Sequence, residues 1–285
     1  MEEKEFRTDR ISAGKLVFYI LAAIICIAWI FPVLWLIATS LKPEGLTSVW
    51  PPEWIADETT FENYVEIFRR FPTVYWLRNS IIVTVIANIL VVFLGSLAAY
   101  SFSRFKFKLN KVLFLIAIAT LIIPQEITIV PLYIALSKLR LSNTYFSLIM
   151  PAVAGPMSIF LFKQFFDGFP RELEEAALID GCSRFRIYWN LILPLSGPVI
   201  AAVTIITFSF VWNDLMWPLI ITATKEAATL PVGIVQEFPL SSFAKVHQYA
   251  KQASISFIAI IPTLLLFLAL QRHFVRGIIS TGIKG

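Results

Sequence analysis

The chain has 285 residues, of which 58% are hydrophobic and 15% are charged, and its mean hydropathy is +0.76. This apolar fraction is too large to be buried in two small cores, so we exclude a water-soluble globular protein and expect lipid to solvate much of the surface. The net charge of +5 does not indicate nucleic-acid binding, because the basic residues lie between apolar stretches and form no single patch with interleaved aromatic residues.

Long uncharged stretches predict the membrane spans. Five of them reach the roughly 20 residues that a crossing helix needs: 16–41, 79–103, 141–162, 187–213 and 252–271. A sixth apolar region, 112–137, is interrupted by Glu126, so its helix either continues past this carboxylate or breaks near Pro124 inside the protein. We therefore expect an all-α, polytopic integral membrane protein with about six transmembrane helices.

The basic residues predict the orientation of these spans. The first stretch is too long for the core of a signal peptide and no small-residue cleavage pattern follows it, so we expect a retained span. One side gathers most of the 24 lysines and arginines, and the positive-inside rule places it in the cytoplasm with both termini. The expected organisation is a cytoplasmic segment 1–15, a six-span transmembrane domain 16–274 with a cytoplasmic segment 167–190, and a cytoplasmic tail 275–285.

Signatures of catalysis are missing from the sequence. The only Gly-Lys pair, Gly14-Lys15, lacks the rest of a phosphate-binding loop, so we do not expect this chain to bind ATP through that motif. His247 and His273 are isolated, and the two cysteines form no zinc-binding spacing or disulfide framework. We expect no catalytic residue, no metal site and no cofactor in this chain.

The cytoplasmic segment 167–190 predicts a helical hairpin. Pro170 suits the first turn of a helix, and the three glutamates that follow suit the positive end of its dipole. Gly181 can end that helix in a left-handed conformation, and Ser183 can cap a second helix that leads into the membrane.

One face of the first hairpin helix carries small residues beside a carboxylate. At helical spacing this face is formed by Leu173, Ala176, Ala177 and Asp180. Small side chains allow another protein to approach closely. By physical reasoning alone, a well-capped linker helix at the membrane surface explains the same residues, so the two interpretations stay open at this point.

The hairpin resembles a known signature, E-A-A-x-x-x-G-x(9)-I-x-L-P, of the membrane subunits of ATP-binding-cassette (ABC) importers. The matching residues are Glu175, Ala176, Ala177, Gly181, Leu191 in place of isoleucine, Leu193 and Pro194. The resemblance extends along most of the chain and narrows to carbohydrate-type permeases of the maltose and glycerol-phosphate kind. Further similar motifs are Ser40-Leu41-Lys42-Pro43, Ile123-Pro124-Gln125, Trp212-Asn213-Asp214, Leu230-Pro231-Val232-Gly233 and Ile283-Lys284-Gly285.

The resemblance implies a permease subunit that forms half of a translocation path. Its expected partners are a homologous second permease subunit, two cytoplasmic ATPase subunits that bind ATP and Mg, an external solute-binding protein, and membrane lipid. The helix matching residues 173–180 would be the coupling helix that docks on the ATPase. The residues implied in coupling are Glu175, Ala176, Ala177, Asp180, Gly181 and Pro194, and Lys284 and Gly285 of the tail would reach between the ATPase subunits.

Polar groups within the spans are candidates for the translocation path, because each is costly in hydrocarbon. The candidates are Gln125, Glu126, Trp212, Asn213, Asp214 and Trp217, since aromatic faces beside an amide and a carboxylate suit a sugar ring. Two alternatives stay open. The carboxylates can lie at the outer membrane edge or bond to neighbouring helices, and the partner permease can hold most of the substrate contacts.

Two other functions compete with the importer subunit. A secondary transporter would use Glu126 and Asp214 as ion-coupling carboxylates, but six spans are few for such a carrier and the hairpin would have no role. A non-transporting membrane anchor is disfavoured by the prolines and polar residues that interrupt the spans. The sequence leaves the ligand open between a sugar monomer, an oligosaccharide, a polyol and glycerol phosphate.

Overall fold

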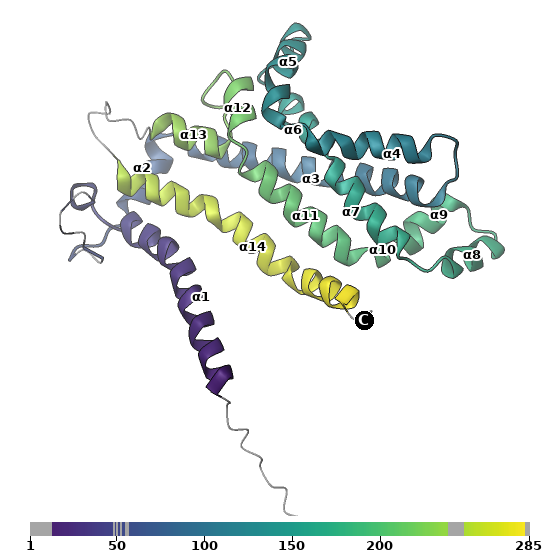
Figure 1. The fold of residues 1–285 in the computed structure, drawn as a ribbon. Coiled ribbons are helices and arrows are strands. Elements are labelled where there is room, and N and C mark those ends of the chain that lie inside the picture. The colour runs from purple at the N-terminus through teal and green to yellow at the C-terminus, as the bar shows by residue number, and fades with distance from the viewer. Residues whose placement is uncertain are drawn as a thin grey trace, which may run out of the picture. The chain divides into compact units, whose positions relative to one another are not determined.

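The computed structural model describes residues 13–47, 49, 51, 53–54, 57–238 and 248–282. Every regular element in these ranges is a helix, so the predicted all-α class is confirmed (Figure 1). The elements are α1 (Ala13–Ser40), η1 (Glu44–Leu46), α2 (Glu62–Arg70), α3 (Thr73–Arg104), α4 (Asn110–Ala119), η2 (Thr120–Ile122), α5 (Gln125–Lys138), α6 (Tyr145–Val153), α7 (Pro156–Asp167), α8 (Glu172–Ile179), α9 (Arg184–Ile187), η3 (Tyr188–Ile192), α10 (Leu193–Leu195), α11 (Gly197–Trp212), α12 (Met216–Ile221), α13 (Leu230–Glu237) and α14 (Tyr249–Gly282).

Three helices of the described chain, α1, α3 and α14, are each long and apolar enough to cross a membrane. Three further pairs meet the same criteria together but are bent: 110–122 with 125–138 by 101°, 145–153 with 156–167 by 41°, and 184–195 with 197–212 by 76°. Counting each bent pair as one span gives the six spans that the sequence predicts. The interrupted sixth region is the most sharply bent pair: its helix breaks at Pro124, and Glu126 lies in the first turn of the second helix, α5.

Prolines explain where the bent spans break. Ile123 is extended because the ring of Pro124 disfavours the helical conformation of the residue before it. Pro156 and Pro198 each lie in the first turn of the second helix of their pair, where a missing backbone N–H costs no hydrogen bond. The breaks are therefore encoded locally.

One compact unit comprises residues 1–67 and 242–258. Buried polar contacts hold its described part together: the Asn63 amide donates to the carbonyl oxygens of Ser40 and Lys42, at 2.9 and 2.8 Å, and the Ser254 hydroxyl donates to Ser40. Lys251 pairs with Glu66 at 2.8 Å. None of the most apolar stretch of α1 is buried within the structure, as expected of a helix that faces lipid or a partner.

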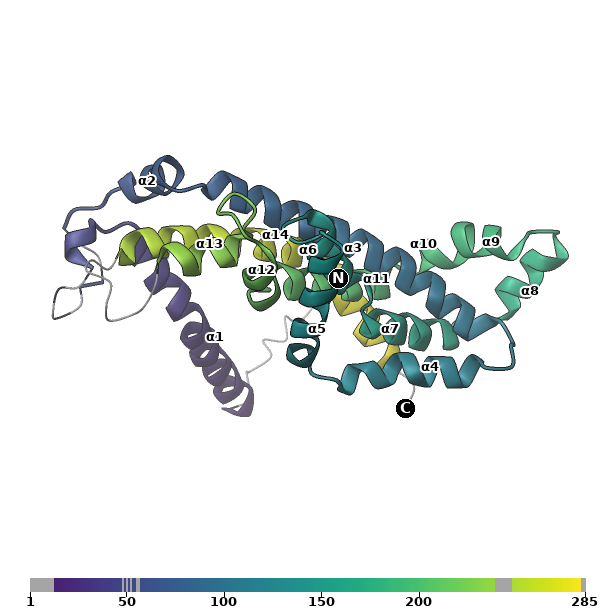
Figure 2. The ribbon, with the colours of Figure 1, turned by 90° about the horizontal axis from the view of Figure 1, so that it is seen from above.

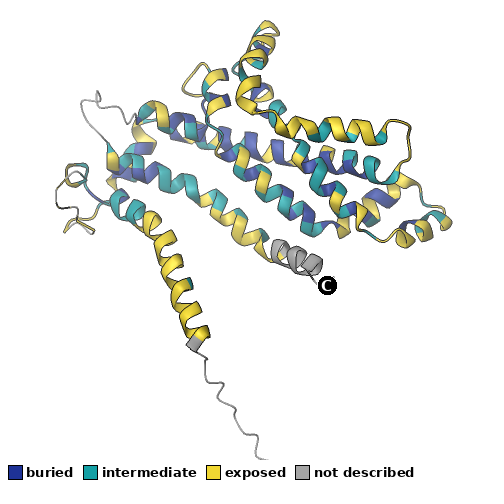
Figure 3. Ribbon diagram, in the orientation of Figure 1, coloured by how far each residue is buried: buried dark blue, intermediate teal, exposed yellow. Residues whose placement is uncertain are grey.

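The second unit, residues 68–241 and 259–285, is built around α3. This helix packs most extensively against α7, α11 and α6, which lie along it in both ribbon views (Figures 1 and 2). At Gly95 the helices approach so closely that an added Cβ would lie 2.4 Å from the Ser158 hydroxyl. Buried residues run along the whole of α3, whereas α4 has none and α5 only Leu136 (Figure 3).

Candidate functional site

The hairpin that the sequence predicts is present as α8, a glycine stop and α9. Gly181 has a φ of +80°, and the N–H groups of Gly181 and Cys182 donate to the carbonyls of Leu178 and Ala177, both at 3.0 Å. This pair of bonds is the Schellman arrangement that closes a helix with a left-handed residue. The Ser183 hydroxyl accepts from the Arg186 N–H and caps α9, so both predicted signals are confirmed, although α8 begins at Glu172, two residues after Pro170.

The exposed surface of α8 differs in part from the predicted face. Leu173, Ala176 and Asp180 are exposed, as expected, and so is Glu175. Ala177, however, is half-buried against the hydrophobic core, so the prediction that it lies on the exposed face is wrong. The residues at positions 174, 177 and 178 share the inner face, because they follow the i, i+3, i+4 spacing of a helix.

The most exposed apolar side chain of the hairpin is one that the sequence reasoning missed. Ile179 has 87% of its surface exposed, and Leu173 has 47%. Together with Ala176 they give α8 an uncovered apolar surface, which we call the α8 tip and define as Leu173, Ala176 and Ile179. Isoleucine is usually buried, so a well-defined helix that presents one at its end is suited to contact with another protein.

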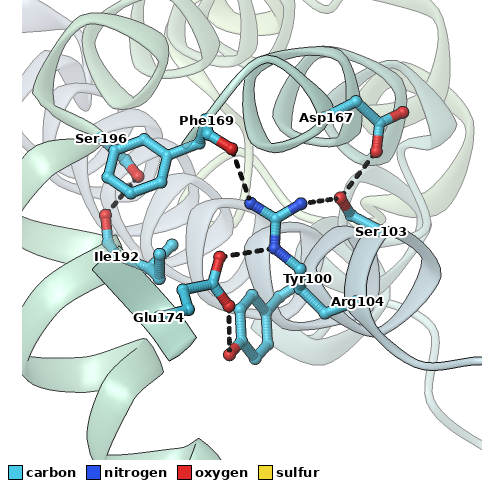
Figure 4. Close-up of polar contacts among 8 residues, drawn as sticks. All are labelled: Tyr100, Ser103, Arg104, Asp167, Phe169, Glu174, Ile192 and Ser196. Atoms are coloured by element: carbon cyan, nitrogen blue, oxygen red, sulfur yellow. Dashed lines mark hydrogen bonds and ion pairs between the residues drawn. The ribbon is translucent and has the colours of Figure 1, made fainter. Parts of the chain in front are cut away.

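A buried ion pair fixes α8 to the end of α3 (Figure 4). The Arg104 Nε donates to Glu174 Oε1 at 2.5 Å, and the side chains are only 5% and 6% exposed. The other carboxylate oxygen of Glu174 accepts from the Tyr100 hydroxyl at 3.2 Å. Burying two charges is favourable only when they are paired and their remaining sites are satisfied, as they are here. Glu174 therefore holds α8 in place and is unavailable to a partner.

Arg104 also forms a hydrogen bond with the segment that leads into α8. Its guanidinium donates to the Phe169 carbonyl at 3.3 Å and to the Ser103 hydroxyl at 2.9 Å, and that hydroxyl donates to Asp167 at 2.6 Å (Figure 4). Neither Arg104 nor Glu174 was singled out from the sequence as a site residue. The inner-face position of this carboxylate was the available signal, because a buried glutamate requires a partner.

Pro194, the last of the implied coupling residues, lies exposed in α10. The preceding residues, 188–192, form a π-helical turn in which the Leu193 N–H donates to the Tyr188 carbonyl, and the Ser196 hydroxyl donates to the Ile192 carbonyl at 2.5 Å. Proline cannot donate a backbone hydrogen bond, so a widened turn beside it re-pairs the carbonyls. Pro194 thus lies close to the 76° bend of this span.

A cavity of about 840 Å³ brings together five of the six candidate path residues. Gln125 and Glu126 reach it from the first turn of α5, Asn213 and Asp214 from the segment between α11 and α12, and Trp217 from α12. Those five are Gln125, Glu126, Asn213, Asp214 and Trp217. The α3 residues Ser80 and Thr84 and the α13 cap Thr229 also line it and were not predicted.

The two tryptophans differ from what a sugar-stacking pair would need. Trp212 is 2% exposed, stacks on Phe208 with ring centroids 5.5 Å apart, and donates its indole N–H to the Ala259 carbonyl; it does not line this cavity. Trp217 lines the cavity but is largely buried, and its indole N–H donates to the Ser147 carbonyl at 2.8 Å. Both rings therefore contribute to packing of the helices around the cavity.

Asp214 lies in the short connection between α11 and α12. Its carboxylate accepts from the Trp217 N–H at 3.4 Å, a long contact. Burial raises the pKa of the Asp214 carboxyl, and its backbone hydrogen bonds partly oppose that shift. Glu126 and Asn213, in contrast, are exposed. The predicted tail residues Lys284 and Gly285 lie outside the described residues.

Comparison with known proteins identifies the family. Residues 91–280 match the family described as binding-protein-dependent transport system inner membrane component. The chain is 32% identical over 270 residues to the arabinooligosaccharides transport system permease protein AraQ of Halalkalibacterium halodurans, covering 92% of this chain and 94% of that protein. It is 34% identical over 274 residues to the trehalose/maltose transport system permease protein MalG of Thermococcus litoralis, covering 93% and 94%.

A solved structure shares the fold. A chain of a bacterial ABC transporter involved in alginate import matches with a TM-score of 0.81 at 19% identity, covering 96% of this chain and all of that one. The resemblance to carbohydrate-type ABC importer permeases, first drawn from the hairpin signature, is therefore confirmed. This multi-pass chain belongs to the family of inner membrane components of binding-protein-dependent transport systems.

Proposed function

We propose that this chain forms half of the translocation path of an ATP-driven importer and couples to a separate ATPase through α8. The observation that carries the proposal is the α8 tip: an uncovered apolar surface on a helix that is held to the spans by a buried ion pair. A freely hanging helix could not transmit force, whereas one fixed to α3 moves with the membrane domain. Glu175, exposed beside the tip, would supply a polar contact to the ATPase.

The proposed complex contains a homologous second permease, two cytoplasmic ATPase subunits that bind ATP and Mg, and an external solute-binding protein. Family membership supports this composition in general terms. We further propose that both termini face the cytoplasm, because this orientation places the basic loop 103–111 and the hairpin on the side of the ATPase. Closure of the ATPase subunits would then move α8 and rock the spans between two openings.

The proposed cargo is a sugar or a related polyol. Relatives are named for arabinooligosaccharides and for trehalose and maltose. The cavity supports this class, because hydroxyl, amide and carboxyl groups of Ser80, Asn213 and Asp214 line it beside apolar side chains. A polyhydroxylated ligand needs this mixture of hydrogen-bonding groups and apolar surface. Gln125, Glu126 and Trp217 are the other candidate residues that we propose to lie along the path.

Cross-linking tests the ATPase contact directly. In a chain carrying Cys26→Ser and Cys182→Ala, we expect Ile179→Cys to cross-link to the co-expressed ATPase subunit. The control is Ile122→Cys, which has nearly the same exposed fraction, 83% against 87%, but lies at the break between α4 and α5. Cross-linking at residue 122 and none at residue 179 would refute the docking assignment. Uptake by this chain alone in liposomes would instead favour a secondary transporter.

A further inference from the structure

Both ends of α3 are fixed by buried polar contacts. At its C-terminal end, Arg104 and Tyr100 bond to Glu174 of the hairpin. Near its N-terminal end, the Asn79 amide donates to the carbonyls of Glu226 and Ala228, at 2.7 and 2.9 Å. Each set joins segments far apart in sequence: the separations are 70 and 74 residues at the C-terminal end of α3 and 147 and 149 residues near its N-terminal end. Neither set of contacts can form unless α3 is in place.

The contacts near Asn79 hold one loop as a unit. Trp76 donates its indole N–H to the Lys225 carbonyl at 2.8 Å, and Ser80 accepts from the Leu230 N–H at 2.8 Å. The Trp76 ring also lies so close to Gly233 that an added Cβ there would be 2.2 Å from it. The loop 222–229 is therefore attached to α3 through the carbonyls of Lys225, Glu226 and Ala228. Its last residue, Thr229, lines the cavity.

Between these ends, α3 is a single helix without a break. It is the only candidate span in the described chain without proline; the other spans contain Pro32, Pro124, Pro151, Pro194 or Pro262 among others. From Asn79 to Arg104 the helix covers about 37 Å. Its packing against α6, α7 and α11 resists bending. A displacement of one end is therefore carried to the other.

We infer that Arg104 and Asn79 are positioning residues that make α3 the rigid connection between α8 and the loop 222–229 beside the cavity. The inference rests on the proposed function, in which α8 docks on an ATPase. A movement of α8 then displaces the cavity wall, and a ligand-loaded binding protein that acts on the loop end displaces α8. Coupling between two sites is reciprocal, so both directions of signalling use the same helix.

The test uses the complete complex in nanodiscs: this chain, its partner permease, the ATPase subunits and the binding protein with ligand. The readout is the ratio of ATPase rates with and without the loaded binding protein. We expect Arg104→Gln and Asn79→Ala each to lower this ratio about tenfold, within the roughly 5–150-fold range of allosteric coupling. Arg104→Lys, which keeps the charge, should restore part of the stimulation.

The double variant tests whether the two single substitutions break one connection through α3 or cause two independent defects. Substitutions at independent sites this far apart normally add. If α3 is the connection, Asn79→Ala combined with Arg104→Gln lowers the ratio no further than the more severe single variant. The inference would be overturned if the double variant lowered the ratio by the product of the two single effects. An unchanged ratio in both single variants would also overturn it.

If the Arg104 and Asn79 variants fail to assemble into the complex, milder variants test the inference. Tyr100→Phe removes the hydroxyl that donates to Glu174, and Tyr145→Phe removes the one that donates to Asn79 Oδ1 at 2.6 Å. We expect each to lower the ratio about threefold, as for the loss of one hydrogen bond. Tyr75→Phe on the exposed side of α3 is the matched control and should change nothing. Equal ratios in all three variants would contradict the inference.

The wild-type complex separates the two proposals. If the wild-type chain fails to copurify with an ATPase, the proposed function fails. If the wild-type ATPase is stimulated and the α3 variants are stimulated equally, the proposed function stands and only the role of α3 is refuted.

Discussion

The hairpin and the cavity are two polar regions of the same unit, and their side chains are held very differently. At the hairpin, Glu174 and Arg104 are buried, paired and bonded to further groups. At the cavity, Glu126 is exposed and Asp214 has a long hydrogen bond to the Trp217 backbone. The hairpin charges are therefore fixed in one arrangement, whereas the two cavity carboxylates are held by fewer and longer contacts. The force transmission that we propose for the hairpin needs the first property, and the ligand passage that we propose for the cavity needs the second.

Removing one carboxylate from each region should give the largest difference in stability between the two regions. Glu174→Ala leaves the Arg104 charge buried without its partner, which destabilises by about 3–5 kcal/mol. Asp214→Ala removes a carboxylate that burial already disfavours, so we expect a change below about 1 kcal/mol. Thermal melting of each purified variant measures these two changes in stability. Similar melting temperatures for the two variants would show that the hairpin is not the more rigid region.

Gly181→Ala should have the next largest effect. No atom lies within 4 Å of the added methyl group, so only the left-handed backbone opposes the change, by about 1–2 kcal/mol. Gly45→Ala is the control, because it also meets open space and has no positive φ. We expect lower thermal stability and weaker ATPase stimulation for residue 181 alone. Equal behaviour of the two variants would argue against a strained helix stop.

Substitutions at the N-caps of α9 and α13, Ser183 and Thr229, should change the stability in opposite directions. Ser183→Ala removes the hydroxyl that accepts from Arg186 and should destabilise by about 1 kcal/mol. Thr229→Val replaces a buried hydroxyl that has no hydrogen-bond partner within the described chain, so it should be neutral or stabilise by up to about 1 kcal/mol. Melting temperatures test this. Reduced transport by Thr229→Val at unchanged stability would show that a ligand uses this hydroxyl.

The smallest expected effect is a dependence on pH. Because the pKa of Asp214 is raised in the folded protein, the folded state binds a proton more tightly than the unfolded state, and stability falls as pH rises through that pKa. Asp214→Asn removes this loss, so it should raise the melting temperature at pH 7 and leave it unchanged near pH 4. A gain of the same size at both pH values would exclude titration of Asp214 as the cause.

Local signals in the sequence were sufficient for much of the hairpin and for the spans. The glycine stop and the Ser183 cap were predicted, and the break near Pro124 was one of two alternatives, because each depends on a few consecutive residues. Uncharged length predicted five of the six spans in the same way, since lipid requires it of each helix separately.

Only the tertiary structure decided which polar groups meet. Arg104 and Glu174 are 70 residues apart, and their pairing depends on how α3 packs beside α8. Packing likewise brought Gln125 to Asn213 and Asp214 while directing Trp212 toward Ala259. The physical reason is that a side chain's neighbours within its own helix follow from spacing, whereas its neighbours on other helices depend on packing that no short segment encodes.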